Sequence, residues 1–265
     1  MTEFRELDLT GARFERVRLD DSTFHRVHLD RAQLRLVDLS GARIRGATVK
    51  ECRLRAVEMY DVEISGDLHN VVVNGVDIAP LVDAELNRRM PERALMRPED
   101  SDGFRLAWSV LERLWADTVE RARTFPEAML HRRVDDEWSF VETLRHLGFA
   151  SAAWVERMIL GNPSPWHPLD LPWDEAPGWE GVPWDREARP SLDEALSVRR
   201  RRQASVRDVI AGLGDEQLRG RVTRTEPGWP QGEDFPVVEC LRIVLIEEWE
   251  HHLYAERDLN ALEKG

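Results

Sequence analysis

The sequence predicts a protein of two domains, a short repeat solenoid followed by an all-α four-helix bundle. Two observations support this. Large apolar residues recur at every fifth position from Phe4 to Ile64. After about residue 98 this period disappears, helix start and stop patterns take its place, and all ten tryptophans follow. The length of 265 residues also exceeds that of one average domain.

Composition and charge disfavour several classes of protein. A hydrophobic content of 42% with 33% charged residues is typical of a folded globular chain. No apolar run approaches the roughly 18 residues of a membrane span, and the N-terminus lacks the pattern of a signal peptide. The net charge of −13 argues against binding to nucleic acid or to an anionic membrane. Cys52 and Cys240 make no disulfide framework, so we expect a cytoplasmic protein.

The five-residue period has two components. One is a series of thirteen large apolar residues, Phe4, Leu9, Phe14, Leu19, Phe24, Leu29, Leu34, Leu39, Ile44, Val49, Leu54, Met59 and Ile64. The other lies two positions earlier from Leu9 onward and is mostly small or β-branched, as at Ala12, Val17 and Cys52. A period of five fits neither a helix nor a simple strand. It indicates a solenoid in which one large and one small side chain per repeat point to a central axis.

In the segments 9–14 and 39–44 this pattern resembles the pentapeptide-repeat family, and the resemblance extends over about residues 4–66. It implies a right-handed, four-sided (quadrilateral) β-helix of a little over three coils, serving as an interaction or oligomerisation module for a protein partner. Some members of the family look like duplex DNA and protect topoisomerases with an acidic rod. Residues 1–70 carry 12 basic and 13 acidic side chains, and this near balance makes such mimicry the least favoured function.

The segment after the repeats is expected to cap the solenoid. Val71–Val73 is typical of a strand and Asn74–Gly75 of a turn. A short helix with Pro80 near its start should follow. We therefore divide the chain into residues 1–78, the repeat domain with its cap, 79–98, a linker with a short helix, and 99–265, the helical domain.

Four helices are expected in the second domain, at about residues 101–124, 139–160, 191–212 and 237–265. Ser139 with Glu142, and Ser191 with Glu194, form capping-box patterns at two of the starts. A connection rich in proline and tryptophan, residues 163–190, should pack across the bundle as an ordered lid. The cluster Arg199–Arg202 is interpreted as a solvated helix face. Four helices with one long crossover make a four-helix bundle.

The last helix bears two pairs of residues spaced four apart. Glu247 and His251 form one pair, Glu248 and His252 the other, and the members of each pair share a helix face. A carboxylate and an imidazole at this spacing can chelate a divalent metal if a third ligand comes from elsewhere. The alternative is a Glu/His surface pair that holds no metal.

His146 lies on the flank of the second helix and by itself is interpreted as a partly buried, hydrogen-bonded histidine or a partner of Glu142. The string Trp-Ser-x-x-Glu-x-Leu-x-His-Leu that ends at Leu147, together with the histidine-bearing last helix, resembles the DinB-like superfamily over about residues 101–262. These four-helix bundles include metal-dependent thiol S-transferases that use mycothiol or bacillithiol. In them a histidine of the second helix, which His146 matches, joins a His-x-x-x-His pair of the last helix around a divalent metal.

The resemblance thus implies a metal site made of His146, Glu247 and His251, in which a glutamate replaces one histidine of the family's pair. Such a set suits Zn²⁺, Ni²⁺, Mn²⁺ or Fe²⁺. The alternative register, Glu248 with His252, is turned by 100° around the helix, so only one register can face His146.

The last-helix string Glu-Trp-x-His-x-x-Tyr-Ala-x-Arg-Asp-Leu is similar to the subgroup in which a DinB-like bundle follows pentapeptide repeats. This favours Glu247 with His251 and leaves His252 more exposed. Further residues of the same helix are expected as pocket walls or outer contacts of the site: Trp249, Tyr254, Arg257 and Asp258.

Two functions from different classes stay open. In the first, the protein is an enzyme in which a metal lowers the pKa of a bound low-molecular-weight thiol or water, and this nucleophile attacks a small-molecule electrophile under the lid. In the second, the Glu/His tract is a structural polar network and the protein is a non-catalytic assembly factor that docks a partner on its solenoid. The resemblance to DinB-like bundles also implies a homodimer.

Overall fold

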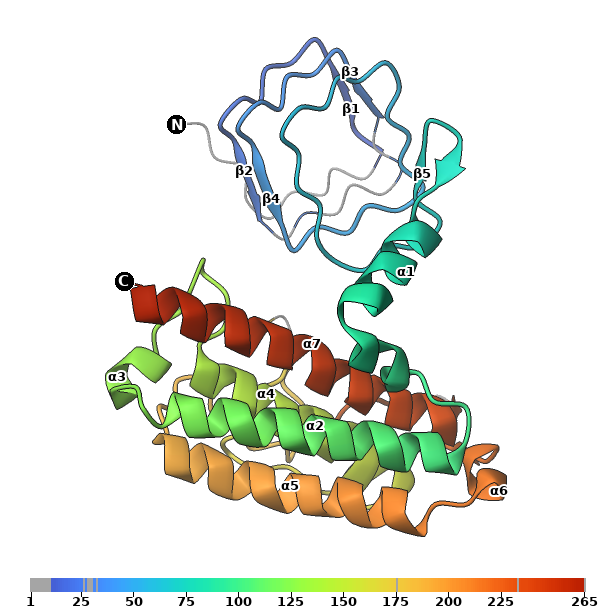
Figure 1. Ribbon diagram of the computed structural model, residues 1–265, viewed down its shortest axis with the longest axis vertical. Coiled ribbons are helices and arrows are strands. Elements are labelled where there is room, and N and C mark those ends of the chain that lie inside the picture. Colours follow the sequence, from blue (N-terminus) through green and yellow to red (C-terminus); the bar gives the residue numbers. More distant parts are fainter. Residues whose placement is uncertain are drawn as a thin grey trace. The chain divides into compact units, whose positions relative to one another are not determined.

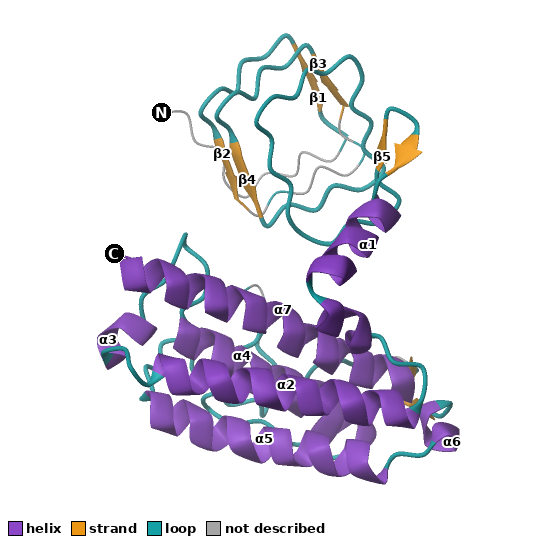
Figure 2. Ribbon diagram, in the orientation of Figure 1, coloured by secondary structure: helices purple, strands orange, loops and turns teal. Residues whose placement is uncertain are grey.

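The computed structural model describes residues 11–25, 27, 31, 33–174, 176–232 and 234–264. The chain forms two compact units, residues 1–68 and 69–265. Short strands are the regular structure of the first unit, whereas the second is mainly helical (Figures 1 and 2). Within the described residues, no helix combines the length and the apolar character needed to cross a membrane.

The first unit contains stacked parallel strands. They are β1 (Arg13–Glu15), β2 (Thr23–His25), β3 (Gln33–Arg35) and β4 (Arg43–Arg45). β1 pairs with β3 and β2 with β4, and each residue lies opposite the one 20 positions later. Because 20 residues are four repeats of five, large apolar residues meet in register, Phe14 beside Leu34 and Phe24 beside Ile44. An offset of four repeats is the one that the resemblance to four-sided pentapeptide repeats implies.

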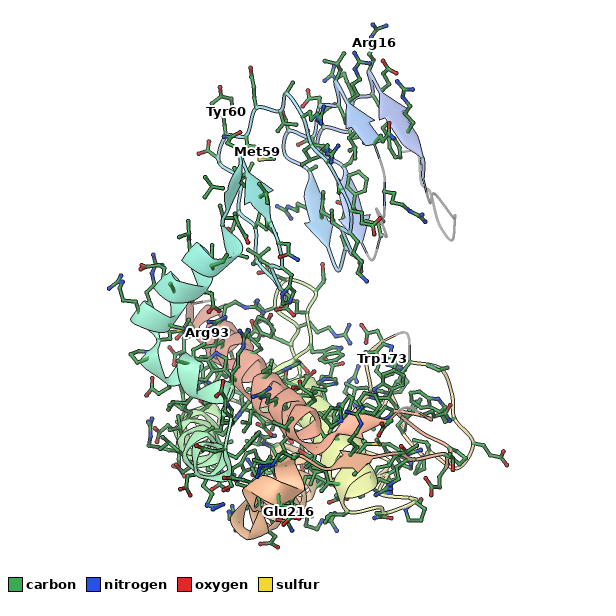
Figure 3. All side chains as sticks on the ribbon, turned by 90° about the vertical axis from the view of Figure 1, so that its right-hand side faces the viewer. Arg16, Met59, Tyr60, Arg93, Trp173 and Glu216 are labelled. Atoms are coloured by element: carbon green, nitrogen blue, oxygen red, sulfur yellow. The ribbon has the colours of Figure 1, made fainter. Side chains whose placement is uncertain are left out.

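The later repeats are more exposed than the period predicts. The large apolar residues that follow β4 expose 47–64% of their surface: Val49, Leu54, Met59 and Ile64. Tyr60, labelled in Figure 3 beside Met59, exposes 79%. No strand is described between residues 51 and 68, so these side chains have no paired coil above them. The prediction that every large residue of the series points into a covered interior is therefore wrong for this part. Phe4, Leu9 and Leu29 lie outside the described residues.

A β-hairpin follows and opens the second unit. β5 (Val72–Val73) pairs antiparallel with β6 (Val76–Asp77). Asn74 and Gly75 between them have φ of 50° and 84°, which is the left-handed conformation that a tight hairpin turn needs. The Asp77 carboxylate accepts from the backbone N–H of Ala79, so the hairpin is tied to α1 (Ala79–Arg89). It therefore belongs with the second unit, whereas the sequence analysis assigned it to the repeat domain.

Four long helical segments make up most of the second unit. They are α2 (Ser101–Ala122), α4 (Phe140–Ser151) continued by the π-helix η2 (Ala152–Ile159), α5 (Leu192–Gly212) and α7 (Val237–Lys264). Shorter elements connect them: the 3₁₀ helix η1 (Pro91–Met96), α3 (Glu127–Leu130), α6 (Asp215–Leu218), β7 (Arg221–Val222) and β8 (Phe235–Pro236). Figure 1 shows α2, α4, α5 and α7 side by side.

Local sequence fixes where these helices begin. Ser139 and Glu142 form the expected capping box at the start of α4, and Ser191 and Glu194 form one at the start of α5. At α2 the N-cap is Asp100, whose carboxylate accepts from the backbone N–H of Gly103, and the helix begins at Ser101. These caps satisfy backbone donors that a helix leaves unpaired.

Apolar packing brings α4 against α7. Val141, Leu144 and Leu147 of α4 are at most 1% exposed and share a core cluster with Ala255 and Leu259 of α7. A second cluster joins α2, η2, α5 and the first half of α7. His146 stands beside this apolar stripe of α4 and is therefore placed at the α4–α7 interface.

Candidate metal centre

His146 is held in one orientation by the chain that crosses over α4. Its Nδ1 lies 3.0 Å from the carbonyl oxygen of Leu171. A carbonyl only accepts, so Nδ1 carries the proton and the neutral ring keeps its lone pair on Nε2. His146 is 9% exposed, and the free nitrogen points toward α7.

Glu247 and His251 meet His146 from α7. The Glu247 Oε2 atom lies 3.2 Å from His146 Nε2 and 3.4 Å from His251 Nδ1. His251 Nδ1 donates to the backbone carbonyl of Glu247 at 2.9 Å, which leaves its Nε2 as the atom with a lone pair. Each of the three residues offers one ligand atom, and these atoms all lie within 4.8 Å of one another.

The electrostatics of this group are compatible with a bound cation. Burial, followed by the charge of His146, lowers the pKa of His251 to about 4, so the ring is neutral and can donate its lone pair at neutral pH. Burial raises the pKa of Glu247, but the hydrogen bond and charge of His146 outweigh it and the net shift is downward. His146 Nε2 and a Glu247 carboxylate oxygen lie 3.2 Å apart. A contact this close needs either a proton or a cation between the two atoms.

The alternative pair of α7 residues, Glu248 and His252, does not face His146. Glu248 is 1% exposed and binds Arg199 of α5, and His252 Nε2 lies 3.0 Å from Thr118 Oγ1 of α2. His252 is 8% exposed, so the expectation that it would be the more exposed histidine is wrong. It faces α2 inside the helical unit.

The arginine cluster on α5 also differs from its interpretation as a solvated face. Arg199 is 2% and Arg202 7% exposed, whereas Arg200 and Arg201 are exposed. Arg202 pairs with Glu156 of η2 and with Asp170 of the long connection. The buried members face acidic partners on neighbouring elements, which the charge run alone does not reveal.

The other predicted α7 residues fall into two groups. Tyr254 lies beside the site, with its ring 5.9 Å from that of His251, and Arg257 lies over the Tyr254 ring at 5.2 Å. Arg257 also pairs with Glu137 and with the buried Asp258. Trp249 is 4% exposed in the apolar core and does not line the site.

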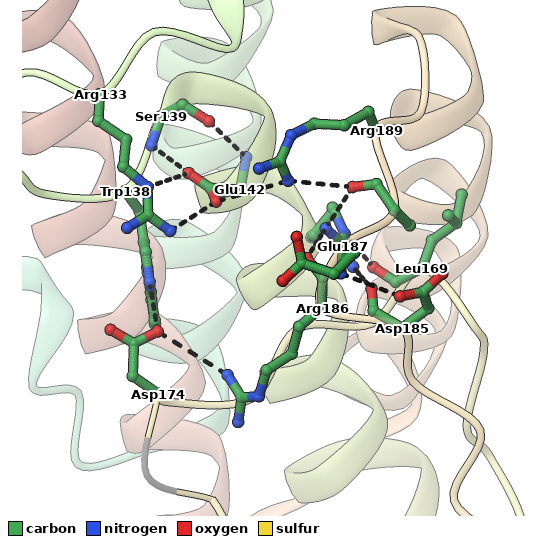
Figure 4. Close-up of polar contacts among 12 residues, drawn as sticks. Arg133, Trp138, Ser139, Glu142, Leu169, Asp174, Asp185, Arg186, Glu187 and Arg189 are labelled. Carbon is green, nitrogen blue, oxygen red and sulfur yellow. Dashed lines mark hydrogen bonds and ion pairs between the residues drawn. The ribbon is translucent and has the colours of Figure 1, made fainter.

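Sequence reasoning missed Trp138, which contacts both histidines. Its ring centroid lies 4.4 Å from that of His146 and 6.0 Å from that of His251. The indole N–H donates to Asp174 at 3.1 Å, and Asp174 lies 3.8 Å from Arg186 (Figure 4). One signal in the sequence could have indicated this contact. Trp138 directly precedes the N-cap Ser139, and a side chain at that position can fold back over the first turns of α4.

The long connection packs as an aromatic layer on α4. Phe149 of α4 contacts the rings of three tryptophans in that segment, at centroid distances of 5.6–6.3 Å: Trp166, Trp173 and Trp184. Phe149 also lies 6.4 Å from His146. The aromatic residues therefore order this segment beside the candidate site, and Leu171 of the same segment supplies the carbonyl that orients His146.

Comparisons with known families match both halves of the chain. A model of the DinB superfamily matches residues 110–255, which include all three candidate ligands. A model of pentapeptide repeats, eight copies in all, matches residues 2–41 and 18–55. No curated protein and no solved structure matches the chain.

Proposed function

Because this chain belongs to the DinB superfamily, a group that includes metal-dependent enzymes, we propose that His146, Glu247 and His251 bind a divalent metal ion. One observation carries this proposal. His146 Nδ1 donates to Leu171, which leaves Nε2 as the nitrogen that can bind a metal, and this atom lies 3.2 Å from the Glu247 carboxylate with the neutral His251 alongside. Two imidazole nitrogens and one carboxylate oxygen fit Zn²⁺, Ni²⁺, Mn²⁺ or Fe²⁺.

We further propose that the reaction is transfer of a low-molecular-weight thiol to a small electrophile. A divalent ion held by three protein ligands would keep open positions and lower the pKa of a bound thiol or water. The protein residues around it have separate tasks. The Leu171 and Glu247 carbonyls hold both histidines in the tautomer with Nε2 free, and the Trp138 ring shields them from one side.

The test of metal binding is metal analysis of protein purified without a chelator and without a histidine tag. Wild-type protein should carry close to one equivalent of metal, and His146→Ala and His251→Ala should each lose most of it. His252→Ala is the matched control, because it removes a buried histidine of the same helix and should keep the metal. Absence of metal in the wild type, after reconstitution with Zn²⁺, Ni²⁺ and Mn²⁺, would overturn the proposal.

The test of the reaction class follows metal loading. Loaded wild-type protein should consume a low-molecular-weight thiol and a small electrophile in equal amounts, and His251→Ala should not. Equal consumption by both proteins would mean that the metal site does not take part.

The second candidate is a non-catalytic assembly protein, and one observation favours it. Polar groups of α7 also pair inside the helical unit where no metal is invoked, as Glu248 does with Arg199, so the His146–Glu247 contact would then be one more structural pair bridged by a proton. Metal-free wild-type protein that stays metal-free on reconstitution supports this reading.

We also propose that the repeats form a right-handed quadrilateral β-helix and that the four long helical segments form the four-helix bundle of the superfamily. The parallel pairing at an offset of 20 residues supports the first, and the mutual packing of α2, α4, α5 and α7 supports the second. The repeat unit would serve as the interaction surface for a protein partner or for a second copy of the chain. Both cysteines are free, which fits the reducing cytosol.

A further inference from the structure

A buried ion pair lies directly next to the candidate metal ligands on α7. Arg199 of α5 donates to both carboxylate oxygens of Glu248, at 3.1 and 2.6 Å, and the two side chains are 2% and 1% exposed. A bidentate pair of this kind fixes geometry as well as distance, because two parallel bonds allow only one relative orientation.

Trp115 of α2 contacts both members of this ion pair and thereby links it to a third helix. The Arg199 guanidinium lies 4.5 Å from the centre of the Trp115 ring. The Trp115 indole N–H donates to the backbone carbonyl of Glu248 at 3.2 Å. Both the side chain and the carbonyl of Glu248 are therefore held, one from α5 and the other from α2.

Glu248 directly follows the candidate ligand Glu247 on α7, so the contacts that hold Glu248 also affect the metal site. Successive residues of an α-helix are turned by about 100°, so fixing the direction of Glu248 also fixes that of Glu247. We propose that Arg199, Glu248 and Trp115 are positioning residues that set the rotation of α7, so that Glu247 and His251 rather than Glu248 and His252 face His146. This inference rests on the proposed metal site.

Stability alone does not account for such a pair. Taking two charges out of water costs about as much as their attraction returns, and replacing a buried ion pair by apolar side chains of similar volume is often neutral or stabilising. An exposed pair, by contrast, has little effect on geometry or stability. A buried bidentate pair one residue from a ligand is thus better explained by the orientation that it imposes.

The test uses the full chain with the double substitution Arg199→Met and Glu248→Leu, which removes both charges and keeps volume. Zn²⁺ and Ni²⁺ affinities are measured by calorimetry beside thermal unfolding. Metal affinity should fall on the order of tenfold or more, the loss typical when support for a ligand is removed, while the unfolding midpoint stays within a few degrees of wild type. Wild-type affinity in the folded double variant would overturn the proposal.

The matched control is Arg207→Met with Glu112→Leu, the same chemical change in an exposed pair between α5 and α2. It should leave metal affinity unchanged. Arg199→Met alone leaves a buried carboxylate unpaired and should destabilise the fold, so rescue of folding in the double variant separates stability from positioning.

A second measurement separates this inference from the metal proposal. Nuclear Overhauser contacts between the ring protons of His146 and His251 in the metal-free protein report whether His251 faces α4, since the two ring centroids lie 4.9 Å apart. These contacts should be present in the wild type and should weaken in the double variant. If the wild type bound no metal, the proposed function would fail, yet the ring contacts would still test the role of Arg199 and Glu248. Ring contacts of equal strength in both proteins would overturn the positioning role.

Discussion

Glu142 closes the capping box of α4, one turn before His146, and it also binds an arginine. Its carboxylate accepts from the Ser139 backbone N–H at 2.9 Å and from two nitrogens of Arg133 at 3.1 and 2.7 Å (Figure 4). Burial by itself would raise the pKa of Glu142. The Arg133 hydrogen bonds, the Ser139 donors and the Arg133 charge outweigh burial and lower the pKa to about 2. The charged form is thus favoured in the folded state.

This pKa shift predicts how acid affects stability. A carboxyl group with a lowered folded-state pKa contributes stability above its ordinary pKa of 4.5, and this contribution is lost as the pH falls toward about 2. The shift corresponds to at most about 3 kcal/mol. Glu142→Gln should therefore lower the free energy of unfolding at pH 7 by up to this amount, and the deficit should shrink between pH 4.5 and 2. Urea unfolding at several pH values measures it.

Glu194 is the matched control for this prediction. It makes the same capping box with Ser191 at the start of α5, but it is exposed and the hydrogen bonds that lower its pKa come from Ser191 alone. Glu194→Gln should therefore have a smaller and less pH-dependent effect. A deficit in Glu142→Gln that is equal at pH 7 and pH 3 would contradict the explanation.

At the scale of elements, the buried Arg145 holds several points of the long connection between η2 and α5. Arg145, 3% exposed, donates to the carbonyls of Leu169 and Ala188 at 2.8 Å each and to that of Asp185. Its own carbonyl accepts from Leu171 N–H at 3.3 Å. The residue before His146 thus fixes the segment whose carbonyl orients His146.

Arg145→Met should loosen that segment and weaken metal binding together. Buried carbonyls left without a donor cost about 1–3 kcal/mol each, and loss of the group that orients a ligand typically costs tenfold or more in metal affinity. Hydrogen exchange of residues 165–190 should rise more than that of α5. Arg145→Lys should recover only part, because an ammonium lacks the planar fork.

Arg189→Met serves as the control for the connection. Arg189 lies in the same segment, its side chain is 54% exposed, and its contact with Glu142 is 4.0 Å. Its removal should change neither exchange nor metal affinity. If Arg145→Met raised exchange across all helices equally, the arginine would act on the whole unit and not on the connection.

The elements that the sequence predicts well are those set by neighbours in the chain. Ser139 with Glu142 and Ser191 with Glu194 mark helix starts because a cap and its partner are only three residues apart. The contacts that orient the candidate site are long-range. Leu171 follows His146 by 25 residues, and Arg199 precedes Glu248 by 49. A charge run does not show which arginines have buried partners, so Arg199 could not be told from the exposed Arg200.

At the scale of the whole molecule, the family matches confirm repeats followed by a DinB-superfamily unit. The period of five could be recognised because the same pattern of large and small residues recurs in every repeat. The exposure of Met59 and Ile64 depends on where strand pairing ends, and the period gives no information about that end. The assignment of His146, Glu247 and His251 as metal ligands stays a prediction, since the same spacing also serves structural pairs.

The division into two units gives the last prediction. All three candidate ligands, the Leu171 carbonyl and both apolar core clusters lie within residues 69–265. The first described residue that is fully buried is Met96. A fragment of residues 69–265 should therefore fold alone and bind Zn²⁺ or Ni²⁺ with the affinity of the full chain, within about twofold, because each unit that carries its own core can fold independently.

Circular dichroism and calorimetric titration of the fragment beside the full chain measure this. His251→Ala in the fragment is the control for site-specific binding. Equal affinities would assign metal binding to the helical unit and leave the repeats to a separate role, as the proposed interaction surface. A folded fragment that binds metal much more weakly than the full chain would instead mean that the repeat unit supports the metal site, and the two units would then act as one functional body.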